Sequence, residues 1–507
     1  MTHVSSALRP DQEIEWKLAL EADQLVAFKR LMARRRVAPS TQNLLTRYFD
    51  TPEFALGDLG LALRVRRVGR RWIQTLKSER ERHGGLSVRA EYETPVSGDT
   101  PDLSRFPPAA LALIPQPLIK QLAPMFETRF TRTAWLLRTR SGAKIEVALD
   151  VGEVRAGTNS RPLCEVELEL KSGRVEALLD WAMTVTKQIN LLPLDISKAE
   201  RGIQLARGIE VKPVRMGAIK LDPEMSVEDG FAVICRSCLA QFQANLQGVL
   251  REDSPEYLHQ TRVALRRLRA ALRLFHRVCP LTSSDLQQSL RSWNAVLGPT
   301  RDWDVLCLET LPTIAPHFTD AQAWATFAAA AETKRKSAWQ AMRTALTASN
   351  PGRVILQFQL WLMQKTWRDA ATADPLQDLA CLQPLSGFAA HALRAGRRKI
   401  RGKVQDFGQL TFEARHALRI LIKRQRYAVE FFKSLRVAVK GNSYWNALVI
   451  AQDSLGRSND ARVATRLLDT LTVTGDKSAA AFVSGWLAHA TVIRDELVLE
   501  RALKKLI

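Results

Sequence analysis

The hydrophobic pattern of this 507-residue chain changes once along its length, and that change limits what the chain can fold into. Between residue 11 and about residue 205, apolar and polar side chains alternate with period two, as in Glu13–Lys17 and Lys144–Asp150, which is typical of strands. Beyond about residue 225, the pattern becomes one of long helical segments rich in Ala, Leu and Arg. We therefore predict an α+β protein in which a sheet domain precedes an all-helical one.

The stretch between the two patterns contains Pro213 and Pro223 and has little periodicity, which indicates a connector. We place the first domain at 1–210, the linker at 211–224 and the helical domain at 225–507. Amphipathic stretches at 23–36 and 174–189 predict two helices that flank the sheet.

The charge of the chain predicts a polyanionic partner. Lys and Arg number 74 against 52 Asp and Glu, which gives a formal net charge of +22. Residues 1–220 hold 35 basic and 26 acidic residues, and the remainder holds 39 and 26, so both parts are basic. Nucleic acid, an anionic membrane face and free phosphate chains all fit such a charge, and composition alone does not choose among them.

The cysteines and the apolar runs favour a soluble, cytoplasmic protein. The six cysteines are scattered, and Cys235 with Cys238 forms a lone CxxC in an apolar helical run, where we expect buried packing and not a zinc site. The first ten residues lack the apolar core of a signal peptide. We see no apolar run that approaches the roughly 18 residues of a membrane span.

In the strand region, charged side chains repeat on one face of each predicted strand, because residues i and i+2 of a strand share a face. An open sheet would direct these charges to water and the apolar faces to a core. A closed barrel could instead direct the apolar faces outward against helices and enclose the charges in a lumen. A lumen lined by both carboxylates and basic groups would suit divalent cations together with a polyphosphate. The charged sets are Glu13/Glu15/Lys17, Arg64/Arg66, Thr75/Lys77, Arg89/Glu91/Glu93, Glu146/Asp150 and Glu165/Glu167/Glu169.

An ordered set of motifs in this region resembles CYTH domains, the triphosphate tunnel metalloenzymes. The set spans essentially all of 11–205: Glu13-Ile-Glu-Trp-Lys17 (an ExExK pattern), Tyr48-Phe-Asp-Thr-Pro52, Leu63-Arg-Val-Arg66, Thr75-Leu-Lys77, Glu146 to Asp150, Glu165-Val-Glu-Leu-Glu169 and Ser197-Lys-Ala-Glu-Arg-Gly202. The resemblance implies an eight-stranded antiparallel tunnel that hydrolyses or cyclises triphosphates with Mg²⁺ or Mn²⁺.

Carried to the matching positions, the resemblance also implies roles for individual residues. The metal carboxylates would be Glu13, Glu15, Glu165 and Glu167, with Asp150 and Glu169 as helpers. The phosphate-binding catalytic cations would be Lys17, Arg64, Arg66, Lys77, Arg132 and Lys198. Arg129 is a second candidate for the arginine on the later strand, and the Phe-x-Arg spacing favours Arg132.

Other reactions and a purely binding role are the alternatives. The motifs leave open a thiamine triphosphatase, an adenylate cyclase of the same fold, or a non-catalytic protein that binds polyphosphate or nucleic acid. No GxxxxGK[ST], HExxH or GxSxG motif occurs in the chain, so the tunnel carboxylates are the candidates for catalysis. We expect inorganic triphosphate to be the substrate, split into diphosphate and phosphate.

The helical region contains a tandem repeat, which we place at about 225–380 and 381–507. His259-Gln-Thr-Arg-Val-Ala-Leu-Arg-Arg-Leu-Arg269 is similar to His416-Ala-Leu-Arg-Ile-Leu-Ile-Lys-Arg-Gln-Arg426, and Leu297-Gly-Pro-Thr-Arg-Asp-Trp-Asp-Val305 to Leu455-Gly-Arg-Ser-Asn-Asp-Ala-Arg-Val463. The repeat predicts two basic stripes, each on one helical face. The stripes consist of His259, Arg262, Arg266, Arg269 and Arg273, and of His416, Arg419, Lys423 and Arg426.

Such stripes could be solvated or neutralised by internal carboxylates, with Asp302, Asp304 or Asp460 as candidates, or they could bind phosphate groups. The two repeated motifs resemble CHAD domains, helical modules of pseudo-two-fold symmetry that bind inorganic polyphosphate and often follow CYTH domains. The resemblance implies polyphosphate as a partner, with localisation at polyphosphate granules as a further expectation. Because aromatic stacking residues are not interleaved with the stripes, nucleic acid is not expected.

Overall fold

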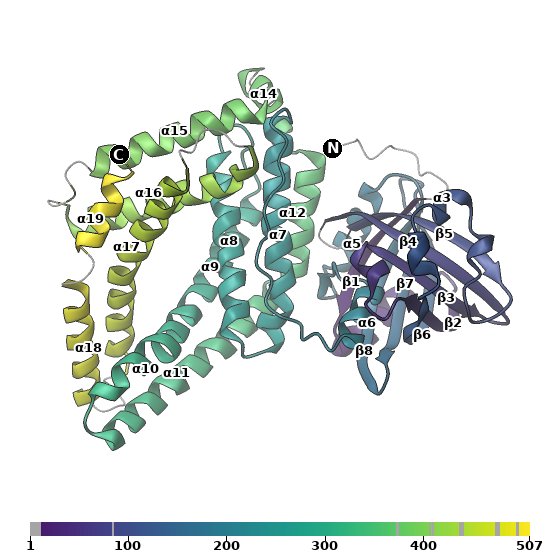
Figure 1. Cartoon of the computed structure of the whole chain (residues 1–507), viewed down its shortest axis with the longest axis horizontal. Helices are drawn as coiled ribbons and strands as arrows, with labels where there is room; N and C mark the ends of the chain where they lie inside the picture. The colour runs from purple at the N-terminus through teal and green to yellow at the C-terminus, as the bar shows by residue number, and fades with distance from the viewer. Residues whose placement is uncertain are drawn as a thin grey trace. The chain divides into compact units, whose positions relative to one another are not determined.

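The computed structural model describes residues 12–83, 86–371, 375–404, 407, 410–435, 441–471, 477–492 and 496–506. The chain forms two compact units, which Figure 1 shows as a strand-rich part and a helical part. The first unit consists of residues 1–212 together with 350–363, and the second of 213–349 together with 364–507. No helix in the described ranges is long and apolar enough to cross a membrane.

The first unit is built on one antiparallel sheet that closes on itself. Its described strands follow the order β5-β4-β3-β2-β6-β7-β8-β1-β9, and β1 also pairs with β5, which closes eight of them into a barrel. The sequence predicted eight strands, and the ninth is the short β9, which pairs with β1 over Leu18–Leu20. The strands are β1 (Gln12–Leu20), β2 (Ser40–Asp50), β3 (Leu61–Val68), β4 (Arg71–His83), β5 (Leu86–Val96), β6 (Ala123–Arg138), β7 (Lys144–Ala156), β8 (Asn159–Ser172) and β9 (Leu191–Pro193).

The alternation of β1 shows how the barrel separates its two faces. Ile14, Trp16 and Leu18 are buried in a core cluster on the outside of the barrel wall, together with the apolar faces of β6, β7 and β8. Glu15 and Lys17, at the intervening positions, face the lumen and are only 2% and 5% exposed. The closed-barrel interpretation of the charge pattern is therefore confirmed, because the charged faces line an interior cavity.

Helices cover the outer face of the barrel. The predicted helices at 23–36 and 174–189 correspond to α1 and α5, whose buried faces join the core around Trp16. A second outer cluster contains Leu63 and Leu76 and lies beneath the short helices α2 and α3. The helices that precede the connector are α1 (Leu25–Ala33), α2 (Ala55–Asp58), α3 (Pro108–Leu111), α4 (Gln116–Ile119), α5 (Glu176–Val185) and α6 (Lys198–Ala206).

A helix from far along the sequence completes the first unit. Residues 350–363, most of α12 (Pro351–Gln364), group with the barrel although the sequence placed them inside the helical domain. Leu356 is fully buried in the barrel's outer core cluster. Arg353 donates a hydrogen bond to the Met183 carbonyl oxygen at 3.0 Å. Gly352 approaches so closely that a Cβ there would lie 1.7 Å from the Leu191 carbonyl oxygen.

The second unit is helical over its described residues, as the sequence predicted. In chain order its helices are α7 (Val227–Arg251), α8 (Pro255–Leu274), α9 (Ser284–Asp304), α10 (Leu311–Ile314), α11 (Ala321–Ala348), α13 (Trp367–Ala371), α14 (Pro375–Leu382), α15 (Leu385–Val404), α16 (Phe412–Phe431), α17 (Gly441–Asp469), α18 (Lys477–Val492) and α19 (Glu496–Lys504). A single π-helical turn, Val305–Thr310, connects α9 to α10.

The internal repeat appears as the same packing made twice. Helix α8 contacts α7 and α9, and α16 contacts α15 and α17. The two copies meet through α8 against α16 and α9 against α17. This arrangement places the two predicted basic stripes, one on α8 and one on α16, at the junction of the repeats. Cys235 and Cys238 on α7 are both buried, as expected for packing residues.

Candidate active site in the tunnel and basic centre in the helical unit

The barrel encloses a polar cavity of about 290 Å³, which we call the tunnel. Its wall contains all six predicted phosphate-binding cations and four of the six predicted metal carboxylates, Glu13, Glu15, Glu167 and Glu169. Asp150 and Glu165 are absent from that wall, because they lie behind it with no exposed surface. Arg132 is in the wall, whereas Arg129 is largely exposed and pairs with Glu127 at 2.6 Å.

Opposite charges pair along one side of the tunnel. Strand register brings Lys77 of β4 opposite Glu91 of β5, and the Lys77 ammonium lies 3.0 Å from Glu91 and 2.8 Å from Glu13. Glu91 also pairs with Arg64 at 3.2 Å. Burial alone would raise the pKa of Glu91, but Lys77 and Arg64 outweigh it, so the pKa of this carboxyl lies below its usual value.

A second group of ion pairs surrounds Lys198 at the start of α6. A capping box fixes this end of the helix: the Ser197 hydroxyl accepts from the Glu200 backbone N–H at 3.1 Å, and the Glu200 carboxylate accepts from the Ser197 backbone N–H at 2.7 Å. The next residue, Lys198, therefore projects its ammonium toward the barrel. It lies 2.7 Å from Asp150 and 2.8 Å from Glu167, and it also pairs with Glu165.

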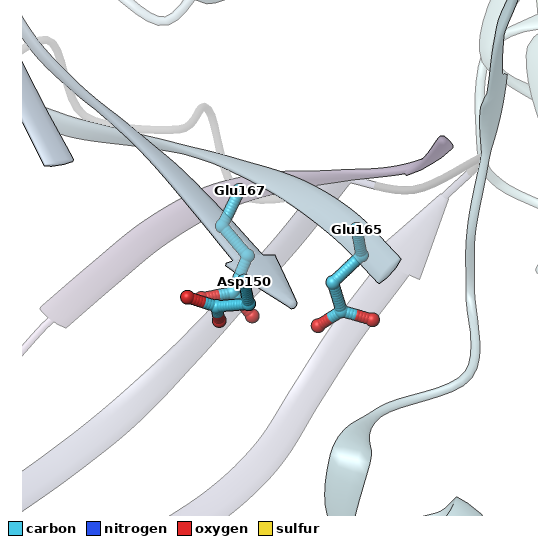
Figure 2. Close-up of side chains that lie close together, drawn as sticks. All are labelled: Asp150, Glu165 and Glu167. Atoms are coloured by element: carbon cyan, nitrogen blue, oxygen red, sulfur yellow. The ribbon is translucent and has the colours of Figure 1, made fainter. Parts of the chain in front are cut away.

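The three carboxylates that hold Lys198 lie close enough together to be a metal site by geometry alone. Figure 2 shows the carboxylates of Asp150, Glu165 and Glu167 converging, with one oxygen of each within 4.8 Å of the others. Their acceptor positions are already taken by Lys198 and by Arg132, whose Nε is 2.8 Å from Asp150, and Arg201 pairs with Glu165. A metal ion at the centre of this triad would have to displace the Lys198 ammonium.

The electrostatics of the triad agree with a cation-holding role. Burial would raise the pKa of Glu167, but Lys198, Arg132 and Lys17 hold it well below its usual value. Burial would lower the pKa of Lys198, but Asp150, Glu165 and Glu167 raise it instead. Both groups are therefore charged across the physiological range, and Lys198 is fixed in the tunnel wall as a permanent cation.

Two other carboxylates of the tunnel pair with a lysine of their own strand. Glu15 pairs with Lys17 at 3.0 Å, and Glu169 pairs with Lys171 at 2.6 Å. Burial raises the pKa of Glu169 in spite of Lys171, and the nearby Glu13 and Glu146 contribute in the same direction. These carboxylates face the cavity, so their oxygens can exchange an ammonium partner for a ligand that enters it.

Arg66 is the exception among the tunnel cations. No carboxylate among the described residues lies within ion-pair distance of it, and its Nε donates to the Thr46 hydroxyl at 3.0 Å. Burial and the neighbouring Arg64 and Arg132 lower the pKa of Arg66 to about 10. Asp150 opposes this shift from beyond ion-pair distance, so an anion in the tunnel would supply a closer counter-charge.

Two residues that line the tunnel, Glu91 and Tyr48, and one behind its wall, Arg201, had no role in the sequence-based prediction. Glu91 was placed on a charged strand face without a function, and Arg201 lies inside a quoted motif. Tyr48 lines the cavity and stacks on Phe126 at 4.6 Å between ring centroids. Burial would raise the pKa of Tyr48, but Arg64, Arg66 and Lys198 lower it. The period-two rule could have identified Glu91, since it shares the face of Glu93.

In the helical unit, part of each predicted stripe forms a cluster that we call the basic centre: Arg262 and Arg266 of α8 with Arg419 and Lys423 of α16. Lys423 is near enough to Arg419 and Arg266 that, with burial as the largest cause, its pKa falls to about 7. Arg262 lies 3.5 Å from Asp302, and Arg419 lies 3.9 Å from Asp460. Two of the predicted counter-carboxylates are thus in place.

The other predicted stripe residues lie outside this cluster. Arg269, Arg273 and His416 are exposed, and His259 is half-buried. Arg426 lies over the rings of Tyr427 and Trp445, at 5.6 and 5.9 Å from their centroids. Asp304 does not face the stripes, because its buried carboxylate accepts from Trp339 at 2.8 Å and from Arg335 at 3.1 Å.

Comparisons with known proteins agree with both units. A model of the CYTH domain matches residues 11–203, and a model of the CHAD domain matches residues 233–469. An inorganic triphosphatase from Haemophilus influenzae is 34% identical over 197 residues, which cover 38% of this chain and 55% of that protein. The chain thus spans about half the length of that relative.

A solved structure of the CHAD domain from the plant Ricinus communis is 30% identical to this chain. The match has a TM-score of 0.51 and covers 58% of this chain and 96% of that one. The chain belongs to the CHAD domain family, and a CYTH domain precedes its CHAD domain.

Proposed function

We propose that the tunnel hydrolyses inorganic triphosphate to diphosphate and phosphate with a bound Mg²⁺ or Mn²⁺. The observation that supports this most is the tunnel itself, a cavity of about 290 Å³ walled by seven lysines and arginines and eight glutamates, in which no carboxylate of the described residues lies within ion-pair distance of Arg66. A short, highly charged anion fits such a wall. The name of the Haemophilus influenzae relative points to the same reaction.

The size and lining of the tunnel favour an inorganic substrate over a nucleotide. Among the described lining residues, Tyr48 is the one aromatic side chain, and it already stacks on Phe126. A nucleotide base or a thiazolium ring would therefore have no unstacked aromatic side chain to stack on among the described lining residues of the tunnel. ATP and thiamine triphosphate are therefore the comparison substrates in the test below.

The carboxylate set of the tunnel fits a hard divalent cation. Glu13, Glu15 and Glu169 line the cavity and offer oxygen ligands, which Mg²⁺ and Mn²⁺ prefer, and Glu167 lines it as well but is shared with Lys198 and Arg132. Asp150 and Glu165 are better assigned to holding Lys198 and Arg132, since both are fully buried and already paired with these cations. A bound divalent cation would polarise the phosphoryl group and lower the pKa of a bound water.

The residues of the chain then have separable tasks. Lys198 and Arg132, fixed by buried carboxylates, bind phosphate oxygens without changing their own position. Lys17 and Lys77 can exchange a glutamate for a phosphate, since each ammonium is paired inside the cavity. Arg66 supplies a positive charge that no carboxylate of the described residues pairs with directly. Preorganised cations of this kind stabilise the charge of a phosphoryl-transfer transition state.

A phosphate-release assay tests the reaction. Purified full-length protein is assayed with tripolyphosphate, ATP, thiamine triphosphate and long-chain polyphosphate, each with Mg²⁺, Mn²⁺ or EDTA. We expect metal-dependent release from tripolyphosphate in preference to the others. A double variant Glu13→Ala/Glu15→Ala should abolish turnover, whereas Glu153→Ala, a half-exposed glutamate of β7, is the control. Full turnover in the double variant, or in EDTA, would contradict the metal assignment.

We also propose that the helical unit binds inorganic polyphosphate at the basic centre. Arg266 and Lys423 have no carboxylate within ion-pair distance among the described residues, and the Arg266 Nε is buried without a hydrogen-bond partner. Uncompensated cations at a helix junction are stabilised by an anion. Labelled polyphosphate titrated into the Glu13→Ala/Glu15→Ala variant should bind as it does to the wild type, because the tunnel carboxylates are not part of the basic centre.

The two sites together suggest that polyphosphate binding increases the local supply of substrate. Turnover at limiting tripolyphosphate should then change when long-chain polyphosphate is added to the wild-type protein. Arg266→Gln/Lys423→Gln should remove that response and leave turnover without polyphosphate unchanged. An identical response in this variant and the wild type would contradict the coupling.

A further inference from the structure

The four cations of the basic centre are not equivalent in their surroundings. Arg262 lies beside Asp302, and Arg419 lies beside Asp460. Arg266 and Lys423, in the same cluster, have no carboxylate at ion-pair distance within the described part of the chain. Two of the four cations are thus neutralised from within the protein and two are not.

The two neutralised arginines are equivalent positions of the internal repeat, and so are their partners. Asp302 and Asp460 occupy matching places in the LGxxxD segments that start at Leu297 and Leu455. The glycine of each segment lies near the arginine: Arg262 donates to the Gly298 carbonyl oxygen at 2.6 Å, and a Cβ built on Gly456 would lie 3.6 Å from the Arg419 Nη2. The same pairing of an arginine with an aspartate therefore occurs in both copies of the repeat.

Both ion pairs are weak by their geometry. The N–O distances of 3.5 and 3.9 Å exceed those of close charge-assisted hydrogen bonds, which are about 2.7–2.9 Å. The side chains of Asp302 and Asp460 are 37% and 58% exposed, so solvent screens each pair. Burial and the nearby Asp460 raise the pKa of Asp302 although Arg262 opposes them. Each aspartate is therefore close enough to neutralise its arginine, and its ion pair is weak enough for a ligand to displace it.

We propose that Asp302 and Asp460 compete with a bound polyanion for Arg262 and Arg419, and thereby select for anions of high charge density. The proposal rests on polyphosphate binding at the basic centre. Inorganic polyphosphate has a charge on every consecutive phosphate and can displace both aspartates at once. A nucleic acid strand has a sugar between its phosphates, so it brings fewer charges to the same four cations and displaces the aspartates less well.

Charge-neutral variants of the aspartates test the competition. Asp302→Asn, Asp460→Asn and the double variant are compared with the wild type in titrations of labelled polyphosphate and of single-stranded DNA of similar length, at one fixed salt concentration. We expect each single variant to bind polyphosphate about two- to fivefold more tightly. The gain in affinity for DNA should be larger. The ratio of the affinity for polyphosphate to the affinity for DNA should therefore fall most in the double variant.

Two further variants make the result interpretable. Asp285→Asn removes the same charge from the same helix, α9, at its exposed first turn, and should leave both affinities unchanged. Asp302→Glu retains the carboxylate and should not reproduce the gain of Asp302→Asn. Thermal melting of every variant identifies any that is misfolded, and Asp460→Asn provides an independent test if Asp302→Asn is one of these.

The outcomes separate this inference from the function on which it rests. If the wild type and all variants fail to bind polyphosphate, both are wrong. If the wild type binds polyphosphate and the asparagine variants bind it equally or more weakly, polyphosphate binding stands and the competition is wrong, because the aspartates would then orient the arginines for the ligand.

Discussion

Arg66 is the side chain on which we expect the anion affinity of the tunnel to depend most. It has no carboxylate partner among the described residues, and its pKa is lowered to about 10 by burial and by Arg64 and Arg132. Arg66→Gln should lower kcat/KM for tripolyphosphate about 10- to 100-fold, because a hydrogen bond to a charged group contributes about 1.5–3 kcal/mol. Arg67→Gln, its exposed neighbour, is the control, and equal effects of the two variants would contradict the assignment.

The charge of Lys423 should destabilise the folded protein and strengthen its binding of polyphosphate. The Lys423 pKa of about 7 in the folded protein lies below the ordinary value of 10.5. The charged ammonium therefore lowers the stability of the folded state by its full amount below pH 7, and this destabilisation is lost as pH rises toward 10.5. Lys423→Met should therefore raise the melting temperature, most strongly below pH 7. A bound polyanion favours the charged form, so wild-type affinity for polyphosphate should weaken as pH rises through about 7.

Lys423→Met should remove that pH dependence and weaken polyphosphate binding about tenfold at pH 6, because a hydrogen bond to a charged group contributes about 1.5–3 kcal/mol. Lys433→Met, at an exposed lysine, gives the background effect of losing one charge. Melting curves and polyphosphate titrations between pH 6 and pH 9 measure both properties. A lower melting temperature for Lys423→Met at pH 6 would be incompatible with an uncompensated charge at this position.

At the scale of elements, the position of α6 determines where Lys198 lies. Gly202 of this helix packs so tightly that a Cβ would lie 2.0 Å from the Phe126 ring, which in turn stacks on Tyr48. Gly202→Ala should displace α6, destabilise the protein by about 1–3 kcal/mol and lower turnover. Gly98→Ala, where a Cβ meets no atom within 4 Å, is the matched control. Denaturant unfolding and the phosphate-release assay measure the two effects.

The elements that the sequence predicted best are those with a strong local period. The strand segments Glu13–Lys17 and Lys144–Asp150 lie within β1 and β7, because alternation reports which face is buried without reference to any partner. β9 was not predicted, since three residues are too few to show a period. Asp150 and Glu165 illustrate a second limit: alternation placed them on the charged face, but only the fold shows that Lys198 lies among them.

At the scale of the whole molecule, the membership of residues 350–363 in the first unit was not foreseeable from pattern. The segment has the helical period of its neighbours, and nothing in that period states which core it joins. Gly352→Ala should destabilise the first unit, because the Cβ would lie 1.7 Å from the Leu191 carbonyl oxygen. Gly387→Ala in α15, with open space around the Cβ position, should leave stability unchanged or slightly higher.

The measurement is thermal unfolding of the two variants beside the wild type, with phosphate release as the readout of the tunnel. Gly352→Ala should melt at a lower temperature and lose turnover on mild heating, whereas its polyphosphate binding at room temperature should persist. If Gly352→Ala were as stable as Gly387→Ala, α12 would not be packed on β9 as described.

The insertion of α12 also means that the first unit is discontinuous in the chain. One peptide bond cut in the connector near Pro213 would separate residues 1–212 covalently from the rest of the chain, whereas residues 350–363 would stay joined to the second unit through residues 349 and 364. Limited proteolysis there should yield two fragments on a denaturing gel that still migrate as one particle in a sizing column. Releasing the barrel together with α12 would take cuts at three places, so this pair of domains has no single point at which it can be divided.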